Sequence, residues 1–170
     1  RNMEITTYKE LEFYIEMFKQ GNAELLIIEG LGGLSKSRTV EEIMKDKEHI
    51  NILSHCTPLM LYITGYLNKD KPIIFDDCDT LTKTENNIAL LKMFCETSNT
   101  KQISWFTTSE ILDRYGVPNR YETKSRVIII CNSFKELSEK ISALKDRGWH
   151  LEFKPNNAEV LNKMKEIINY

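Results

Sequence analysis

A glycine-rich segment followed by lysine and serine could bind phosphate. Residues 30–37 are Gly-Leu-Gly-Gly-Leu-Ser-Lys-Ser, close to the phosphate-loop pattern G-x-x-x-x-G-K-[ST]. Glycines let successive backbone N–H groups turn toward an anion, and the N-terminus of the next helix adds positive charge. Lys36 would then contact the β- and γ-phosphates, and the Ser37 hydroxyl would bind Mg²⁺. The candidate cofactor-binding residues are Gly30, Gly32, Gly33, Ser35, Lys36 and Ser37.

Ser35 is the departure from this pattern, because it stands where the pattern has its second glycine. Glycine is favoured there because the backbone must bend without a Cβ in the way. A serine held in a strained conformation costs about 1–3 kcal/mol, which the remaining contacts could absorb. The alternative is that residues 30–37 form only a flexible turn between a strand and a helix.

Two adjacent acids follow a short apolar stretch. Pro72–Phe75 is followed directly by Asp76 and Asp77. Phosphate chemistry needs one acid near the magnesium ion and a neighbour that orients or deprotonates the attacking water. Asp76 fits the metal role and Asp77 the catalytic one, at the carboxyl end of a strand, where such sheets bind ligands. Alternatively, these acids and Asp79 cap a turn and the next helix.

Asn132 is a third candidate catalytic residue. It follows the apolar strand predicted over Val127–Cys131. In a parallel sheet its amide would lie beside the strand that carries Asp76 and could hydrogen-bond the γ-phosphate or the attacking water. Asparagine often ends strands, so the order of loop, acids and amide is the informative feature.

Strands that alternate with helices must position these residues. Short apolar runs predict five strands, at 25–28, 49–53, 72–75, 127–131 and 150–153. Helical spacing of apolar residues also predicts several helices. The first lies within residues 1–20, where Thr6 or Thr7 could cap it, and the others are expected at 36–46, after Pro58, after Thr84, from Phe134 to Arg147 and from Asn157. This alternation predicts an α/β fold, a three-layer αβα sandwich with a mainly parallel five-stranded sheet.

The segment 101–124 lacks this alternation. It predicts a hairpin, with Gln102–Thr107 paired to Tyr121–Thr123, and a short helix around Ile111. Its aromatic and basic side chains could stack on DNA bases and contact phosphates. Alternatively, the two aromatic residues pack on the core. The side chains concerned are Trp105, Phe106, Lys101, Arg114, Arg120 and Lys124.

Together these motifs resemble those of AAA+ ATPases, within the P-loop NTPase superfamily. The order is similar to Walker A, Walker B, sensor-1 asparagine and arginine finger, carried by Gly30–Ser37, Ile73–Leu81, Arg126–Asn132 and Ala143–Gly148. The resemblance runs from Leu25 to about Pro155. It implies ATP and Mg²⁺ as ligands, self-association into a ring, and an Asn132 strand between the loop strand and the Asp76 strand.

The resemblance also implies a catalytic role for Arg147, whose guanidinium would reach a neighbouring subunit's γ-phosphate. Alternatively, Arg147 only interacts with the macrodipole at a helix C-terminus. Two features depart from the family: Asp77 replaces the usual Glu, and the small helical lid does not fit after Pro155. We therefore expect a core over residues 1–155 and a C-terminal helix over 156–170 that could begin a lid.

Composition places limits on other functions. The formal net charge of −2 gives no overall electrostatic footprint for nucleic acid. No apolar run is long enough to span a bilayer, and residues 1–20 do not resemble a signal peptide, so a cytoplasmic protein without membrane partners is expected. The cysteines lack a CxxC pair, and the histidines have no metal-ligand spacing among themselves or with the cysteines, so no structural zinc site is expected.

The sequence thus predicts an ATPase domain that couples ATP hydrolysis to work on DNA or a protein partner, in replication or a mobile element. One alternative is a P-loop kinase of small molecules, which would need an arginine-rich lid that this sequence lacks. Another is a nucleotide-dependent scaffold that does not hydrolyse ATP, suggested by Ser35 and Asp77.

Overall fold

The computed structural model describes residues 2–105, 110–141, 144 and 147–169. Its centre is a six-stranded sheet with the order β1-β8-β2-β7-β4-β3, in which every neighbouring pair is parallel. The strands are β1 (Asn2–Ile5), β2 (Leu25–Glu29), β3 (Ile50–Ile52), β4 (Ile73–Phe75), β7 (Val127–Cys131) and β8 (Trp149–Phe153). The predicted α/β class and mainly parallel sheet are confirmed. The predicted position of the Asn132 strand, β7, between β2 and β4 is confirmed as well.

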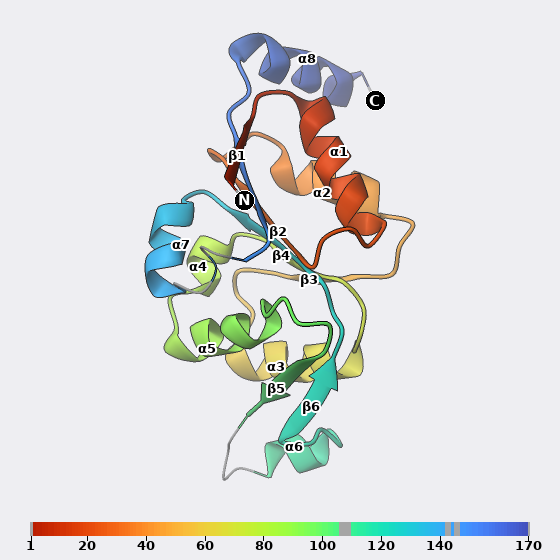
Figure 1. Cartoon of the computed structure of the whole chain (residues 1–170), viewed down its shortest axis with the longest axis vertical. Helices are drawn as coiled ribbons and strands as arrows, with labels where there is room; N and C mark the ends of the chain where they lie inside the picture. The colour runs from red at the N-terminus through yellow and green to blue at the C-terminus, as the bar shows by residue number, and fades with distance from the viewer. Residues whose placement is uncertain (1, 106–109, 142–143, 145–146, 170) are drawn as a thin grey trace.

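Helices cover both faces of this sheet (Figure 1). Helices α1 and α2 pack on one face, while α3, α4, α5 and α7 pack on the other. The helices are α1 (Tyr8–Lys19), α2 (Lys36–Met44), α3 (Pro58–Leu67), α4 (Cys78–Leu81), α5 (Glu85–Phe94), α6 (Ile111–Arg114), α7 (Phe134–Lys140) and α8 (Asn157–Ile168). Within the residues that the structure describes, no helix is long and apolar enough to cross a membrane.

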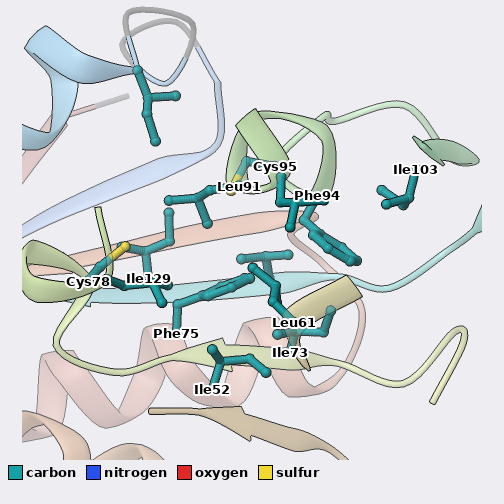
Figure 2. Close-up of a cluster of buried hydrophobic side chains, with 14 of the residues drawn as sticks. Ile52, Leu61, Ile73, Phe75, Cys78, Leu91, Phe94, Cys95, Ile103 and Ile129 are labelled. Carbon is teal, nitrogen blue, oxygen red and sulfur yellow. The ribbon is translucent and has the colours of Figure 1, made fainter. Parts of the chain in front are cut away.

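Burial on both faces explains why the central strands are continuous apolar runs. In β2, Leu25 and Ile27 belong to one core cluster, and Leu26 and Ile28 to the cluster on the opposite face. Side chains alternate between faces along a strand, so a strand covered on both sides is apolar throughout. Figure 2 shows the first cluster, with sheet side chains such as Phe75 close to side chains of α5.

The N-terminal segment corrects one prediction. Asn2–Ile5 forms the edge strand β1, parallel to β8, whereas the sequence predicted a helix from residue 1 and five strands rather than six. Met3 and Ile5 face the core on this strand, but four residues with two apolar side chains are too short a pattern to separate a strand from the start of a helix. The conformation of this segment depends on pairing with β8, far away in the sequence. The predicted cap is present, because the Thr7 side chain accepts a hydrogen bond from Glu10 N.

The predicted hairpin is present as a separate two-stranded sheet. Strand β5 (Lys101–Ser104) pairs antiparallel with β6 (Arg120–Thr123), and α6 lies between them in the sequence. Trp105 packs against Tyr62, with ring centroids 5.9 Å apart, which agrees with the core alternative. Phe106 lies outside the described residues.

Lys101 corrects another prediction, because it was a candidate for DNA phosphate contact. Its side chain is buried, with 1% of its surface exposed, and its ammonium donates to the carbonyl oxygens of Phe94 and Ser125. A phosphate of DNA therefore cannot reach it. Arg114, Arg120 and Lys124 remain exposed.

Candidate phosphate-binding site

The sheet brings the three polar motifs to one edge. The 30–37 loop follows β2, Asn132 follows β7 and Asp76 follows β4, and these strands are parallel neighbours. Carboxyl ends of parallel strands lie at the same edge, where open α/β sheets bind ligands. Segments distant in sequence thus form one site.

The Ser37 hydroxyl and the Asp76 carboxylate are in direct contact. Ser37 Oγ donates a hydrogen bond to Asp76 Oδ1 over 2.8 Å, and the same oxygen accepts from Asp77 N over 2.9 Å. A hydroxyl and a carboxylate are oxygen ligands of the kind that Mg²⁺ prefers. The two candidate metal ligands therefore lie together, at the place where the loop and the acidic strand end meet.

Lys36 folds over the backbone of the loop. Its side chain is only 6% exposed, and Nζ donates to Gly30 O over 2.6 Å and to Leu31 O over 2.7 Å. Burial lowers the pKa of this ammonium, while the nearby Cys131, Asp79 and Asp76 oppose that shift. Two carbonyl oxygens thus hold a desolvated cation, and a phosphate could take their place.

Two loop positions favour glycine, Gly30 because a Cβ has little space and Gly33 because of its backbone conformation. At Gly30 a Cβ would lie 3.0 Å from Phe153 O and 3.2 Å from Lys36 Cδ, tighter than ordinary contact. Gly33 has a φ of 78°, in the left-handed region. The strain inferred for Ser35 is also present, because its φ is 59° and its side chain makes no helix-capping hydrogen bond. The serine thus adopts the conformation that the pattern reserves for glycine.

An open cavity of about 430 Å³ lies at this edge of the sheet. All the predicted loop residues except Gly30 line it, together with both acids and the amide. The lining residues are Gly32, Gly33, Leu34, Ser35, Lys36, Ser37, Arg38, Asp76, Asp77, Asp79, Ile130, Cys131 and Asn132. The cavity therefore combines backbone donors, two cationic side chains and three carboxylates.

Asp79 has a structural role that the sequence did not predict. Its carboxylate accepts from Asn132 N over 2.8 Å and from Ser133 N over 3.2 Å. These bonds join α4 to the end of β7 and hold Asn132 at the cavity. From the sequence, Asp79 was expected only as an alternative cap of a turn and the next helix. Its contact with Asn132 and Ser133 joins segments too distant for a local pattern to reveal.

The structure does not bring Arg147 into this cavity within one chain. Its guanidinium pairs with the Glu96 carboxylate and lines a different cavity. Part of the predicted arginine-finger segment, at 143 and 145–146, lies outside the described residues. Asp77 is exposed at the cavity and is the N-cap residue just before α4, with a left-handed φ of 50°.

A second cavity, of about 450 Å³, adjoins the first. The two cavities share Leu34 and Asn132. Apolar side chains from the loop, the end of β8 and α8 line much of the second one: Leu31, Leu34, Phe153, Pro155 and Val160. A flat apolar group attached to a phosphate chain could occupy it.

Comparison with known proteins gives little information about function. No family model matches the chain. The chain is similar to an uncharacterized 36.7 kDa protein of Enterobacteria phage T4, in the nrdC-mobD intergenic region, with 22% identity over 165 residues. The match covers 87% of this chain and 50% of the relative, so the chain spans about half the relative's length.

Proposed function

We propose that this chain binds a nucleoside triphosphate with Mg²⁺ and hydrolyses it, as the core of an AAA+-type ATPase. The hydrogen bond between Ser37 and Asp76 carries the proposal. It joins a glycine-rich loop to an acidic strand end, in a cavity lined by a lysine and an asparagine. A magnesium-bound triphosphate would use both residues, since the hydroxyl and the carboxylate are ligands of the kind that hold the ion.

Each residue has a defined task in this proposal. The Lys36 ammonium would exchange its two carbonyl partners for phosphate oxygens, and Ser37 and Asp76 would hold a magnesium ion, which would supply positive charge beside the phosphates. Asp77 orients or deprotonates the attacking water. Asn132, held by Asp79, hydrogen-bonds the γ-phosphate or that water.

The apolar cavity beside the loop would hold the nucleobase. Leu31 and Leu34 on the loop and Phe153 at the end of β8 line it, and α8 supplies Val160. Apolar walls with a few polar groups are typical of pockets for small ligands. In this proposal α8 thus contributes to nucleoside binding.

The work driven by hydrolysis is also a proposal. A ring of several copies could act on DNA or a protein partner, in replication or in a mobile element. The cations that remain exposed on the hairpin segment, Arg114, Arg120 and Lys124, could contact DNA phosphates. The phage relative carries no stated activity, so this part depends on the resemblance alone.

The test is binding of a fluorescent ATP analogue with Mg²⁺, together with phosphate release. We expect Lys36→Ala to weaken binding by about tenfold or more, because a charge-assisted contact is worth about 1.5–3 kcal/mol. Asp76→Asn should remove the magnesium dependence. Lys45→Ala, an exposed lysine directly after α2, is the control and should bind as the wild type does. Equal affinity in wild type and Lys36→Ala would disprove the assignment.

The same assay separates the alternatives. Transfer of phosphate to a small acceptor rather than to water would favour a kinase. Tight binding of Mg-ATP without phosphate release, even by the full-length protein, would favour a scaffold that does not hydrolyse nucleotide.

A further inference from the structure

A second polar cluster lies at the ends of β2 and β8. Glu29 and Glu152 are paired residues on these parallel strands, and His150 lies two residues before Glu152, so the last two project from the same face of β8. One ligand atom of each of the three side chains lies within 4.8 Å of the other two. No sequence motif marks this cluster, because Glu29 lies far along the chain from His150 and Glu152.

The His150 side chain in this cluster is buried and lacks a hydrogen-bond partner on one nitrogen. The residue is 8% exposed, and Nε2 has no hydrogen-bond partner among the described residues. The carboxylate oxygen Glu29 Oε1 lies 3.5 Å from Nε2. Burying a polar atom without a hydrogen-bond partner costs free energy, so a ligand bound to His150 Nε2 would remove that cost.

Neighbouring groups hold these side chains in place. Glu29 Oε2 accepts from Phe134 N over 2.7 Å, which leaves Oε1 directed toward His150. The Phe134 ring lies on the imidazole, with ring centroids 4.0 Å apart. Glu152 accepts from Asn2 over 3.0 Å. Such outer contacts orient the ligands in metal sites.

We propose that Glu29, His150 and Glu152 bind one divalent transition-metal ion, for which Zn²⁺ is the probe. Imidazole nitrogen favours Zn²⁺ and its neighbours over Mg²⁺, which prefers oxygen. Bonds of about 2.0–2.2 Å place two tetrahedral ligands about 3.4 Å apart, close to the 3.5 Å between His150 and Glu29. A ligand oxygen of Glu152 lies within 4.8 Å of the other two ligand atoms, and a side-chain rotation would complete the set.

The surroundings leave room for such an ion. A cavity of about 410 Å³ adjoins all three side chains, so a water molecule can complete the coordination. Lys154 pairs with Glu152 over 3.3 Å, and Lys135 and Arg147 line the same cavity. Arg147 is itself paired with Glu96. A divalent ion competes with these cations through direct bonds to three ligands.

The ion would link the carboxyl ends of β2 and β8. This link would lie beside the 30–37 loop, because Glu29 directly precedes Gly30. The ion is distinct from the magnesium proposed at Ser37 and Asp76, and it needs no nucleotide. Failure of nucleotide binding would therefore leave this proposal unchanged, and its own failure would leave the ATPase proposal unchanged.

The first experiment is calorimetric titration of the metal-free protein with Zn²⁺, without nucleotide. We expect one equivalent to bind, and affinity to fall at least about tenfold in His150→Gln and in Glu152→Gln, since even outer-shell changes cost about 10–100-fold. The matched controls are His55→Gln, an exposed histidine, and Cys56→Ser, a half-buried thiol. Both should bind Zn²⁺ as the wild type does.

A second measurement uses the wild type alone, in case a variant fails to fold. We expect Zn²⁺ to shift the imidazole resonances of His150 in the NMR spectrum, and the Co²⁺ protein to lack the intense ultraviolet band of thiolate ligands. Unshifted His150 resonances at saturating Zn²⁺ would overturn the proposal. So would the absence of stoichiometric binding, or binding that is lost in Cys56→Ser or His55→Gln and kept in His150→Gln.

Discussion

Ser35 is the residue at which the 30–37 loop departs from the phosphate-loop pattern, and its backbone is strained. Ser35 has φ 59° and ψ 29°, and its hydroxyl caps nothing. The residue therefore bears the cost of a left-handed conformation without a compensating side-chain bond. Its carbonyl, which any residue would supply, accepts from Thr39 Oγ1 over 2.8 Å.

Replacing Ser35 with glycine should stabilise the protein. Relief of about 1–3 kcal/mol of strain outweighs the roughly 0.5–1 kcal/mol that a more flexible unfolded chain costs, so we expect a gain of about 1 kcal/mol in the free energy of unfolding, measured by urea denaturation. Ser35→Ala keeps the strain and removes only the hydroxyl, so it should give no gain. Equal effects of the two substitutions would show that strain is not the cause.

Thiol reactivity is also set at single residues. Cys78, Cys95 and Cys131 are buried, whereas Cys56 is half-buried. Burial raises the pKa of Cys95 to about 12 and that of Cys56 above its ordinary value of 9.0. The thiolate is the reactive form, so access and pKa together favour Cys56.

A colorimetric disulfide reagent should therefore label native protein at Cys56 first. Because the pKa of Cys56 lies above 9.0, the thiolate fraction and the labelling rate should rise steadily from pH 7 to pH 9. The other thiols should react only after unfolding. Cys56→Ser should lack the fast phase, and rapid labelling of a second thiol in native protein would contradict the burial of the other three.

At the scale of elements, a buried lysine attaches the hairpin to the main domain. Lys101 begins β5, and its ammonium bonds the carbonyls at the end of α5 and just before β7. Burial lowers its pKa, with Cys95 and nearby glutamates opposing the shift. The side chain thus satisfies backbone groups that the ends of these elements leave unpaired.

Lys101→Ala should lower the free energy of unfolding by about 3 kcal/mol, because two charge-assisted hydrogen bonds are lost and buried carbonyls are left without partners. Arg120→Ala, an exposed residue on the paired strand β6, should change it by less than about 0.5 kcal/mol. Urea denaturation measures both. If Lys101→Ala lowered the free energy of unfolding as little as Arg120→Ala does, water would be able to replace the lysine ammonium at the two carbonyls with little loss of stability.

At the scale of the whole molecule, Arg147 does not line the candidate phosphate-binding cavity of its own chain, although Arg38 does. Arg147 pairs with Glu96 and lines another cavity. Stabilisation of transition-state charge by an arginine from a neighbouring subunit, as in related hydrolases, requires assembly. In that case turnover depends on the concentration of protein, not only on the concentration of ATP.

We expect ATP turnover per chain to rise with protein concentration. Arg147→Ala mixed with wild type in equal amounts should lower total turnover below the simple average, because mixed rings contain defective interfaces. Lys45→Ala in the same mixture is the control and should leave turnover unchanged. A strictly additive result would show that Arg147 does not act between subunits.

The sequence by itself determined the strands buried on both faces, the hairpin, and the residues that follow β2, β4 and β7. Local periodicity and short motifs are enough to predict these features. A strand covered on both sides, for example, must be apolar throughout. The order of β2, β7 and β4 came from the family resemblance. Tertiary structure confirmed it and brought Ser37 to Asp76.

Only tertiary structure decided the edge strand β1, the burial of Lys101, the bond from Asn132 to Asp79, and the meeting of Glu29 with His150. Each of these depends on a partner far away in the sequence. Local pattern encodes which side of an element is buried, but not which distant segment covers it, because pairing is selected by the packing of the whole chain.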